Sequence, residues 1–309
     1  MSNRPLYTRA LTPGRVLAWG VLILVLIVTL LPIATVLRTA LTPSTELYAN
    51  SGSLLAGGWT LDNFARVLGL LDEAANAALG GSGANIDVLH ALFNSALFTV
   101  AVVIGQVLFS AMAAYAFARL RFRGSQVVFG LFVASMMVPG IVLFIPNFVL
   151  VKDIGWLNTY AGLVAPFLLF SAFGIFFLRQ FFLSIPKDLE EAALLDGASR
   201  LYIFFRIVLP LSKTPIATLS ILCGIAAWNE FFWPFLVAKD EDMQVLTVAL
   251  QTFKSSTPQG APDWTGLMAA TFLSILPTAV LLISMARRVV ESVAFSGGTP
   301  WKVMHAPCG

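Results

Sequence analysis

Uncharged apolar runs long enough to cross a lipid bilayer recur along the chain. A membrane-spanning helix needs about 20 predominantly apolar residues, because each residue rises only about 1.5 Å along the axis. Five runs reach this length without a charge and a sixth contains only Glu230; the runs are residues 16–37, 91–118, 125–151, 154–178, 214–238 and 264–286. The pattern predicts an all-α polytopic membrane protein with six transmembrane helices.

Two of these runs have features that refine the prediction. The run at 125–151 contains Pro139 and Pro146, and prolines remove backbone donors and kink helices, so we expect a bent or re-entrant segment there. The first run is longer than the core of a secretory signal peptide and has no small-residue cleavage site after it. We therefore expect residues 16–37 to remain as a membrane helix.

The distribution of Lys and Arg predicts which side of the membrane each connection faces. Six spans place both chain ends on one side, and that side holds 14 of the 19 Lys and Arg residues, against five on the other. Because positive residues stay in the cytoplasm, both termini are expected there, together with a polar insert at 184–215. The predicted order is a cytoplasmic tail at 1–15, a first helix at 16–37, an external loop at 38–90, a five-helix core at 91–288 and a cytoplasmic tail at 289–309.

Composition agrees with a membrane protein and narrows the chemistry. The chain is 58% hydrophobic and 11% charged, whereas a soluble domain is about a quarter charged. A net charge of +3 without a basic run gives no reason to expect nucleic-acid binding. Cys223 and Cys308 lie far apart, and His90 and His305 are isolated, so we expect neither a disulfide nor a metal site.

The predicted external loop contains one short amphipathic pattern. Thr60 is placed to cap a helix. The apolar residues that share one face at helical spacing are Leu61, Phe64, Val67, Leu68 and Leu71. Two interpretations stay open: a solvent loop packed on the membrane part, or part of a landing surface for an external binding protein.

The polar insert at 184–215 reads as helix, sharp turn, helix. Pro186 suits a first helical turn, and acids follow it at Asp188, Glu190 and Glu191, where they complement the positive helix end. Gly197 is expected to end this helix, because glycine adopts the left-handed conformation at little cost. We expect a second helix over 198–208 that Pro210 stops. The insert is either a plain amphipathic connector or a compact elbow that another protein approaches closely.

This insert resembles the EAA loop of ABC importer permease subunits. The matching residues are Glu191, Ala192, Ala193, Asp196, Gly197, Ala198, Ile203, Phe204, Ile207, Leu209 and Pro210. The resemblance continues through A-Y-A-F-A-R-L-R-F-R-G at 114–124 and A-W-N-E-F-F-W-P at 227–234. It covers roughly 59–288 and is similar to the maltose-type (MalG-like) branch of sugar importers.

The resemblance implies a type I permease fold and a set of partners. These are a second permease subunit, two ATP-binding subunits that hold ATP and Mg, and an external solute-binding protein. The implied ATPase-coupling residues are Glu191, Ala192, Ala193, Asp196, Gly197 and Ala198. The chain itself has no GxxxxGK[ST] loop, since no glycine precedes a lysine, so we expect no cofactor of its own and no ATPase activity.

Glu230 is the one ionisable residue expected well inside a span. A charge at the bilayer centre costs at least about 2.5 kcal/mol on insertion scales, so Glu230 is expected to face a protein interior or water. Trp228 and Asn229 beside it suit the hydroxyls and C–H faces of a sugar. The set predicted to line a translocation pathway or gate is Trp228, Asn229, Glu230, Phe170 and Phe173. The alternative for Glu230 is an interfacial aromatic belt with the carboxylate reaching headgroup water.

Two other function classes fit less well. A membrane enzyme would need a nucleophile, a metal cluster or an acid–base pair facing one cavity, and the sequence has no HExxH or GxSxG motif. A secondary carrier would need buried coupling acids or histidines. The sequence predicts the permease subunit of an ATP-driven importer for a sugar, or alternatively for glycerol phosphate or another small polar solute. The C-terminal residues Gly297, Gly298 and Lys302 match only loosely the tails that reach the ATPase in such proteins.

Overall fold

The computed structural model describes residues 13–47, 58–79, 87–169, 171–251, 253 and 262–297, and the regular elements in this part of the chain are helices. The main ones are α1 (Pro13–Ala40), α2 (Asp62–Val67), α3 (Glu73–Ala78), α4 (Val88–Arg119), α5 (Ser125–Ser135), α6 (Gly140–Asp153), α7 (Tyr160–Leu168), α8 (Ala172–Ser184), α9 (Asp188–Leu195), α10 (Arg200–Ile203), α11 (Leu209–Leu211), α12 (Lys213–Trp228), α13 (Phe232–Val237), α14 (Leu246–Ala249) and α16 (Trp264–Gly297). A π-helical turn, η1 (Phe204–Val208), joins α10 to α11, and a 3-10 turn, η2 (Glu241–Met243), precedes α14. The all-helical prediction is confirmed.

The apolar helices agree with six membrane segments. Over the described residues, α1, α4 and Trp264–Ile283 of α16 are each long and apolar enough to cross a bilayer, and three bent helix pairs raise the number to as many as six. The pair α5 and α6 meets at 99°, which confirms the bend expected near Pro139. Pro139 immediately precedes α6 with extended backbone, whereas Pro146 lies inside α6 without ending it. The break in this run therefore lies at Pro139, and Pro146 adds no second one.

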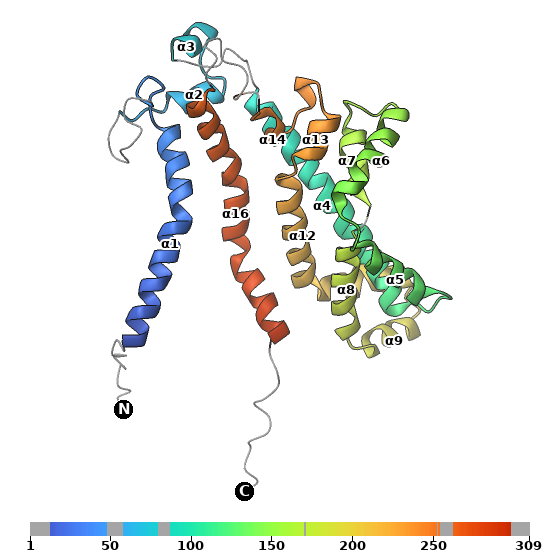
Figure 1. Cartoon of the computed structure of the whole chain (residues 1–309). Coiled ribbons are helices and arrows are strands. Elements are labelled where there is room, and N and C mark those ends of the chain that lie inside the picture. The colour runs from blue at the N-terminus through green and yellow to red at the C-terminus, as the bar shows by residue number, and fades with distance from the viewer. Residues whose placement is uncertain are drawn as a thin grey trace. The chain divides into compact units, whose positions relative to one another are not determined.

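The chain divides into two units, and the first joins the segment up to Asn85 with Phe253–Leu273. Figure 1 shows α2 and α3 beyond one end of α1. The amphipathic helix predicted at 61–71 is confirmed but shorter, since α2 ends at Val67 and Gly69 takes φ +69°. Its buried face is also more polar than predicted. Asn63 donates to the carbonyl oxygens of Ala40 and Thr42 at 2.8 Å each, while Leu61 is exposed.

A buried ion pair completes that polar face. Arg66 Nη2 lies 3.0 Å from Asp263 Oδ1, and both side chains are almost fully buried. Asp263 Oδ1 also accepts from the backbone N–H of Gly266 at 2.9 Å, in the first turn of α16. Opposite charges with few exposed atoms stabilise one pairing of helices, because breaking such a pair strands a charge.

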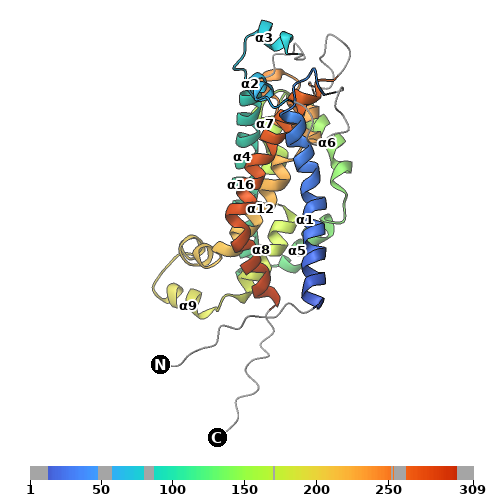
Figure 2. The ribbon, with the colours of Figure 1, turned by 90° about the vertical axis from the view of Figure 1, so that its left-hand side faces the viewer.

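The second unit, Ile86–Thr252 with Ser274–Gly309, is built around α4. This helix packs against α7, α8 and α12. Close approach is possible because Gly105 presents no side chain: a Cβ there would lie 2.2 Å from the carbonyl oxygen of Leu168. Figure 2 shows α9 projecting from one end of this unit.

Two apolar clusters form the core of this unit, one toward each end of α4. One contains Phe98 of α4, Leu163 of α7 and Trp233 of α13. The other contains Ala114 of α4 and Phe182 of α8, with buried residues from the 184–215 insert. The insert is therefore part of the folded core at its own end, rather than a loose connector.

Candidate functional site

The whole insert at 184–215 is called the elbow from here on. Its first half is a short helix closed by a glycine turn. Helix α9 carries acids in its first turn, and Pro186 lies just before it rather than inside it. Gly197 has φ +82°. Its N–H donates to Leu194 O at 3.0 Å, and the next N–H, of Ala198, donates to Ala193 O at 2.9 Å. These two bonds make the Schellman motif that ends a helix at a left-handed glycine, so the predicted turn at Gly197 is confirmed.

The second half of the elbow begins and ends later than predicted. Ser199 caps α10 by accepting from the N–H of Tyr202 at 3.2 Å. The helix then widens into η1, where Leu209 N–H donates back five residues to Phe204 O, and it continues through Pro210 to Leu211. The expectation that Pro210 stops this helix was wrong. A wider turn lengthens the spacing to the preceding carbonyls, which accommodates a proline that would clash in a regular helix.

The elbow presents two different faces. Its inner side is anchored in the core, since Ile203, Phe204 and Val208 are fully buried against α4, α8 and α12. Its outer side exposes large apolar side chains, and these are Leu189, Leu195, Leu201, Tyr202 and Phe205. Leu195 is 89% exposed. Exposed apolar groups clustered on a well-anchored element are typical of a surface that another protein covers.

A buried ion pair ties the elbow to the end of α4. Arg119 Nε lies 2.7 Å from Glu190 Oε1, and the two side chains are only 4% and 5% exposed. Arg119 Nη2 also donates to the carbonyl oxygens of Phe182 and Ile185, at 2.7 and 2.5 Å. Tyr115 OH donates to the other carboxylate oxygen of Glu190 at 3.3 Å. The first helix of the elbow is thus joined to both α4 and the end of α8.

The predicted coupling residues lie on the elbow as a group. Glu191, Ala192, Asp196 and Gly197 are exposed, while Ala193 and Ala198 are half-buried beside the turn. A Cβ at Gly197 would meet nothing within 4 Å. The space next to this turn is therefore open, so the conformation of Gly197, rather than crowding inside the chain, explains the glycine.

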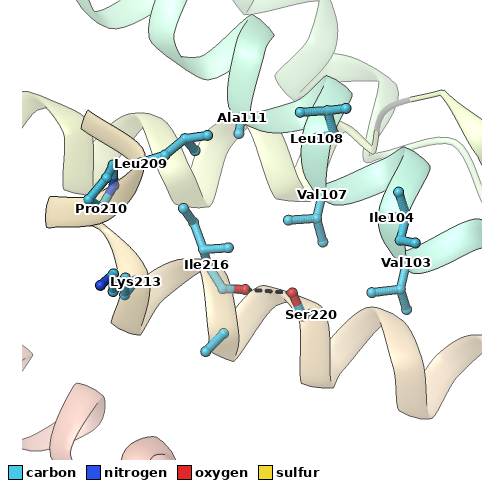
Figure 3. Close-up of a pocket in the computed structure, with 11 residues that line it drawn as sticks. Val103, Ile104, Val107, Leu108, Ala111, Leu209, Pro210, Lys213, Ile216 and Ser220 are labelled. Atoms are coloured by element: carbon cyan, nitrogen blue, oxygen red, sulfur yellow. Dashed lines mark hydrogen bonds between the residues drawn. The ribbon is translucent and has the colours of Figure 1, made fainter. Parts of the chain in front are cut away.

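An apolar groove lies where the elbow meets α12. Figure 3 shows Val103, Val107 and Ala111 of α4 on one side and Ile216 and Ser220 of α12 on the other. Leu209 and Pro210 close one end, beside Lys213, and the groove has a volume of about 540 Å³. Ser220 satisfies its hydroxyl by donating to Ile216 O at 2.9 Å. The elbow and α12 meet at an angle of 82°. The groove at this angle is space that side chains do not fill.

Glu230 lies in a break between helices rather than within one. Helix α12 ends at Trp228 and α13 begins at Phe232, so the run 214–238 is not one continuous helix and Glu230 lies in the connection between two helices. Glu230 Oε1 accepts from the N–H of Trp233 at 3.2 Å, and its backbone oxygen accepts from Thr247 Oγ1 at 2.8 Å. The carboxylate is half-buried and satisfies a backbone donor at the start of α13.

The other residues predicted for the pathway differ in their exposure and in their contacts. Trp228 is half-buried and donates through Nε1 to Ser274 O at 3.0 Å. Asn229 is exposed, although its Nδ2 donates to Ile225 O within its own helix. Phe173, on α8, is 43% exposed and stacks on Phe177. Phe170 lies outside the described residues. Among the described residues of this set, Asn229 and Phe173 are exposed, and Trp228 and Glu230 are half-buried.

The sequence analysis did not single out Arg119, Tyr115 or Glu190. Tyr115 and Arg119 lie within the stretch 114–124 that carries the family resemblance, without a role assigned to either, and Glu190 counted only as one of three acids in a helix start. A signal was present, because Tyr115 and Arg119 lie four residues apart and share one face of α4. The sequence does not show whether Glu190 or Glu191 pairs with Arg119, because it does not determine which face of α9 turns toward α4.

Comparison with known proteins identifies relatives over nearly the whole chain. Residues 106–294 match the family model described as binding-protein-dependent transport system inner membrane component. The sn-glycerol-3-phosphate transport system permease protein UgpE of Escherichia coli O1:K1 is 31% identical over 297 residues, which cover 96% of this chain and 99% of that protein. UgpE of Yersinia enterocolitica is 31% identical over 276 residues, covering 89% of this chain and 94% of that protein.

A solved structure shares the fold. It is the crystal structure of a bacterial ABC transporter involved in the import of the acidic polysaccharide alginate. One of its chains superposes with a TM-score of 0.73 at 23% identity, covering 92% of this chain and 99% of that one. The helical arrangement described above is therefore shared with a chain of that transporter.

Proposed function

The chain belongs to the family of binding-protein-dependent transport system inner membrane components, and from that premise we propose how it works. It is the permease subunit of an ABC importer in the inner membrane. We propose that it forms half of the translocation pathway, beside a second permease subunit, and that it takes its energy from two ATP-binding subunits. An external solute-binding protein delivers the solute. ATP and Mg are held by the partner subunits, not by this chain.

The observation that carries this proposal is the two-faced elbow. Its outer side exposes Leu195, Leu201 and Phe205, and its inner side is buried against α4, α8 and α12. A partner that presses on the outer side moves the elbow as a rigid piece, because interiors are close-packed and resist compression. The motion then reaches the helices on which the elbow rests. We assign the coupling role to Glu191, Ala192, Ala193, Asp196, Gly197 and Ala198 on this element.

The Arg119–Glu190 pair connects the elbow to α4, one of the membrane helices. A push on α9 is transmitted to the last turn of α4 through a contact of 2.7 Å, and α4 packs against α7, α8 and α12. A plain connector would need neither a buried charge pair nor a partner-facing apolar surface. Both features favour the coupling elbow over the connector interpretation.

We propose a sugar or a glycerol phosphate as the solute. Both are small and polyhydroxylated, and both agree with the UgpE relatives, whose name specifies sn-glycerol 3-phosphate. Trp228, Asn229, Glu230 and Phe173 are proposed to line the pathway or its gate, with Asn229 and Glu230 offering polar groups to hydroxyls. Phe170 belongs to the same proposal by its position in the sequence.

Purification from native membranes tests the assembly. A tagged chain solubilised in mild detergent is expected to bring down an ATP-binding protein and a second permease of similar size. ATP hydrolysis of this complex should rise when the loaded binding protein is added. A chain that purifies alone and transports solute without ATP would exclude the proposal and favour a secondary carrier.

A further inference from the structure

A polar cleft, separate from the apolar groove of Figure 3, lies between the end of α4 and the elbow. It has a volume of about 650 Å³. Its walls come from three places: the last turn of α4, the connection to α5, and helix α9 with the start of α10. Figure 1 shows α5 and α9 at the same end of the second unit.

Among the charged side chains that line the cleft, the positive ones outnumber the negative ones. The basic residues are Arg119, Arg121, Arg123, Lys187 and Arg200, and the acidic ones are Glu190 and Glu191. Arg119 and Glu190 neutralise each other as an ion pair. Four basic groups then face one remaining carboxylate, that of Glu191. Like charges gathered around one cavity repel each other, and a bound anion relieves that repulsion.

A buried donor in the cleft lacks a partner. The side chain of Arg119 is 4% exposed. Its Nη2 has two carbonyl acceptors and its Nε lies 2.7 Å from Glu190 Oε1, but neither Nε nor Nη1 has a partner in hydrogen-bond geometry among the described residues. A buried guanidinium with unsatisfied nitrogens is costly, and the charge of an oxyanion in the adjacent cleft stabilises it.

We propose that this cleft binds the phosphate of an anionic membrane phospholipid. The phosphate is held between Arg121 and Arg123 on one side and Lys187 and Arg200 on the other, and Arg119 adds positive charge to the wall of the cleft. Basic pockets at the cytoplasmic ends of transmembrane helices are suited to such headgroups. A lipid bound there bridges α4 and the elbow. The strength of the contact between them then depends on the lipid composition of the membrane.

Two observations favour a lipid over an acidic protein segment. The cleft opens at the end of α4, which is long enough to cross a bilayer, so it lies at headgroup level. Leu120 and Phe122, in the same connection as the arginines, are exposed and line the cleft, so apolar surface is at hand for the glycerol and acyl part. A protein partner has a different surface available, the apolar outer side of the elbow.

The test is retention of lipid by the purified full-length protein together with the subunits that accompany it. The protein is delipidated in detergent, exposed to phosphatidylglycerol or phosphatidylcholine, and analysed by native mass spectrometry for bound lipid. The test variant is Arg121→Gln/Arg123→Gln. The matched control, Arg206→Gln/Lys213→Gln, removes two positive charges from the elbow end of the chain outside the cleft.

The wild type and the control are expected to retain phosphatidylglycerol in preference to phosphatidylcholine. The test variant should lose retention by about tenfold or more, since each basic group near a membrane surface contributes appreciably to binding anionic lipid. Equal retention by the test variant and the control would overturn the proposal. So would binding of inorganic phosphate without lipid, which identifies a free-anion site, or loss of the ATP-binding subunit with lipid retention unchanged, which identifies a protein-docking site.

Discussion

Arg119 Nε and Glu190 Oε1, from the end of one membrane helix and the start of the elbow, lie 2.7 Å apart with almost no exposure to solvent. Both groups are charged, and two residues of the apolar cluster at that end of α4, Tyr115 and Phe182, hydrogen-bond to them. Such pairs contribute little net stability when intact, but removing one partner strands the other. Because of this asymmetry, the pair holds α9 in one position against α4. It also means that replacing Glu190 should affect stability differently from replacing the adjacent Glu191.

Replacing Glu190 with alanine is expected to destabilise the protein, whereas replacing Glu191 is not. Glu190→Ala leaves Arg119 buried without its carboxylate, a change that costs about 3–5 kcal/mol. Glu191 is exposed, so Glu191→Ala should change stability by no more than about 1 kcal/mol. The melting temperatures of the two purified variants in the same detergent measure the difference. Equal melting temperatures would show that the pair is not a structural joint.

Replacing Gly197 with valine is expected to uncouple or weaken the complex. Its φ of +82° is strained for any β-branched residue, so the Schellman turn should distort and shift α9. Gly197→Asn is the matched control, because asparagine tolerates the left-handed region. ATP hydrolysis and solute uptake are measured in the reconstituted complex with the loaded binding protein.

The two Gly197 variants separate backbone strain from contact with a partner. If strain is the cause, Gly197→Asn keeps most of the activity and Gly197→Val loses it. If both lose coupling equally, any side chain at this open position obstructs the partner. A Gly197→Val complex that assembles, hydrolyses ATP on solute addition and transports normally would exclude the elbow as the coupling element.

Replacing Glu230 with glutamine is expected to preserve the fold and alter transport. The amide oxygen of glutamine still accepts from the N–H of Trp233, so the start of α13 keeps its hydrogen bond. Only the charge is removed. Uptake of several sugars and of glycerol 3-phosphate is measured, with Glu241→Gln as the control for an exposed glutamate. Unchanged uptake of every solute by Glu230→Gln would favour the interfacial-belt interpretation of this segment.

The orientation of the chain is tested with single cysteines on a background without Cys223 and Cys308. Leu70 and Gln126 are both exposed, and the charge distribution predicts that they lie on opposite sides of the membrane. Leu70→Cys should react with a membrane-impermeant thiol reagent in intact cells. Gln126→Cys should react only after the cells are permeabilised. The reverse pattern would place the elbow outside and remove it from the ATPase.

The membrane segments and the turn of the elbow were predictable from the sequence. Lipid offers no hydrogen bonds, so an apolar run of sufficient length must form a helix that satisfies its own backbone. The bend before α6 follows from Pro139 in the same local way. The turn at Gly197 was predictable because only glycine readily adopts the backbone conformation that closes a helix in this manner. These features depend on residues close together along the chain.

The pairings between distant residues were decided by the tertiary structure. Arg66 meets Asp263 across 197 positions, and Glu190 rather than Glu191 meets Arg119. The helix continues through Pro210 because η1 widens the turn before it. Glu230 lies in the connection between α12 and α13 instead of within a helix. Helices that are apolar on nearly every side carry no stripe that specifies which face turns inward. The close packing of α4 against its neighbours chooses those faces, and only that packing determines which buried charges find a partner.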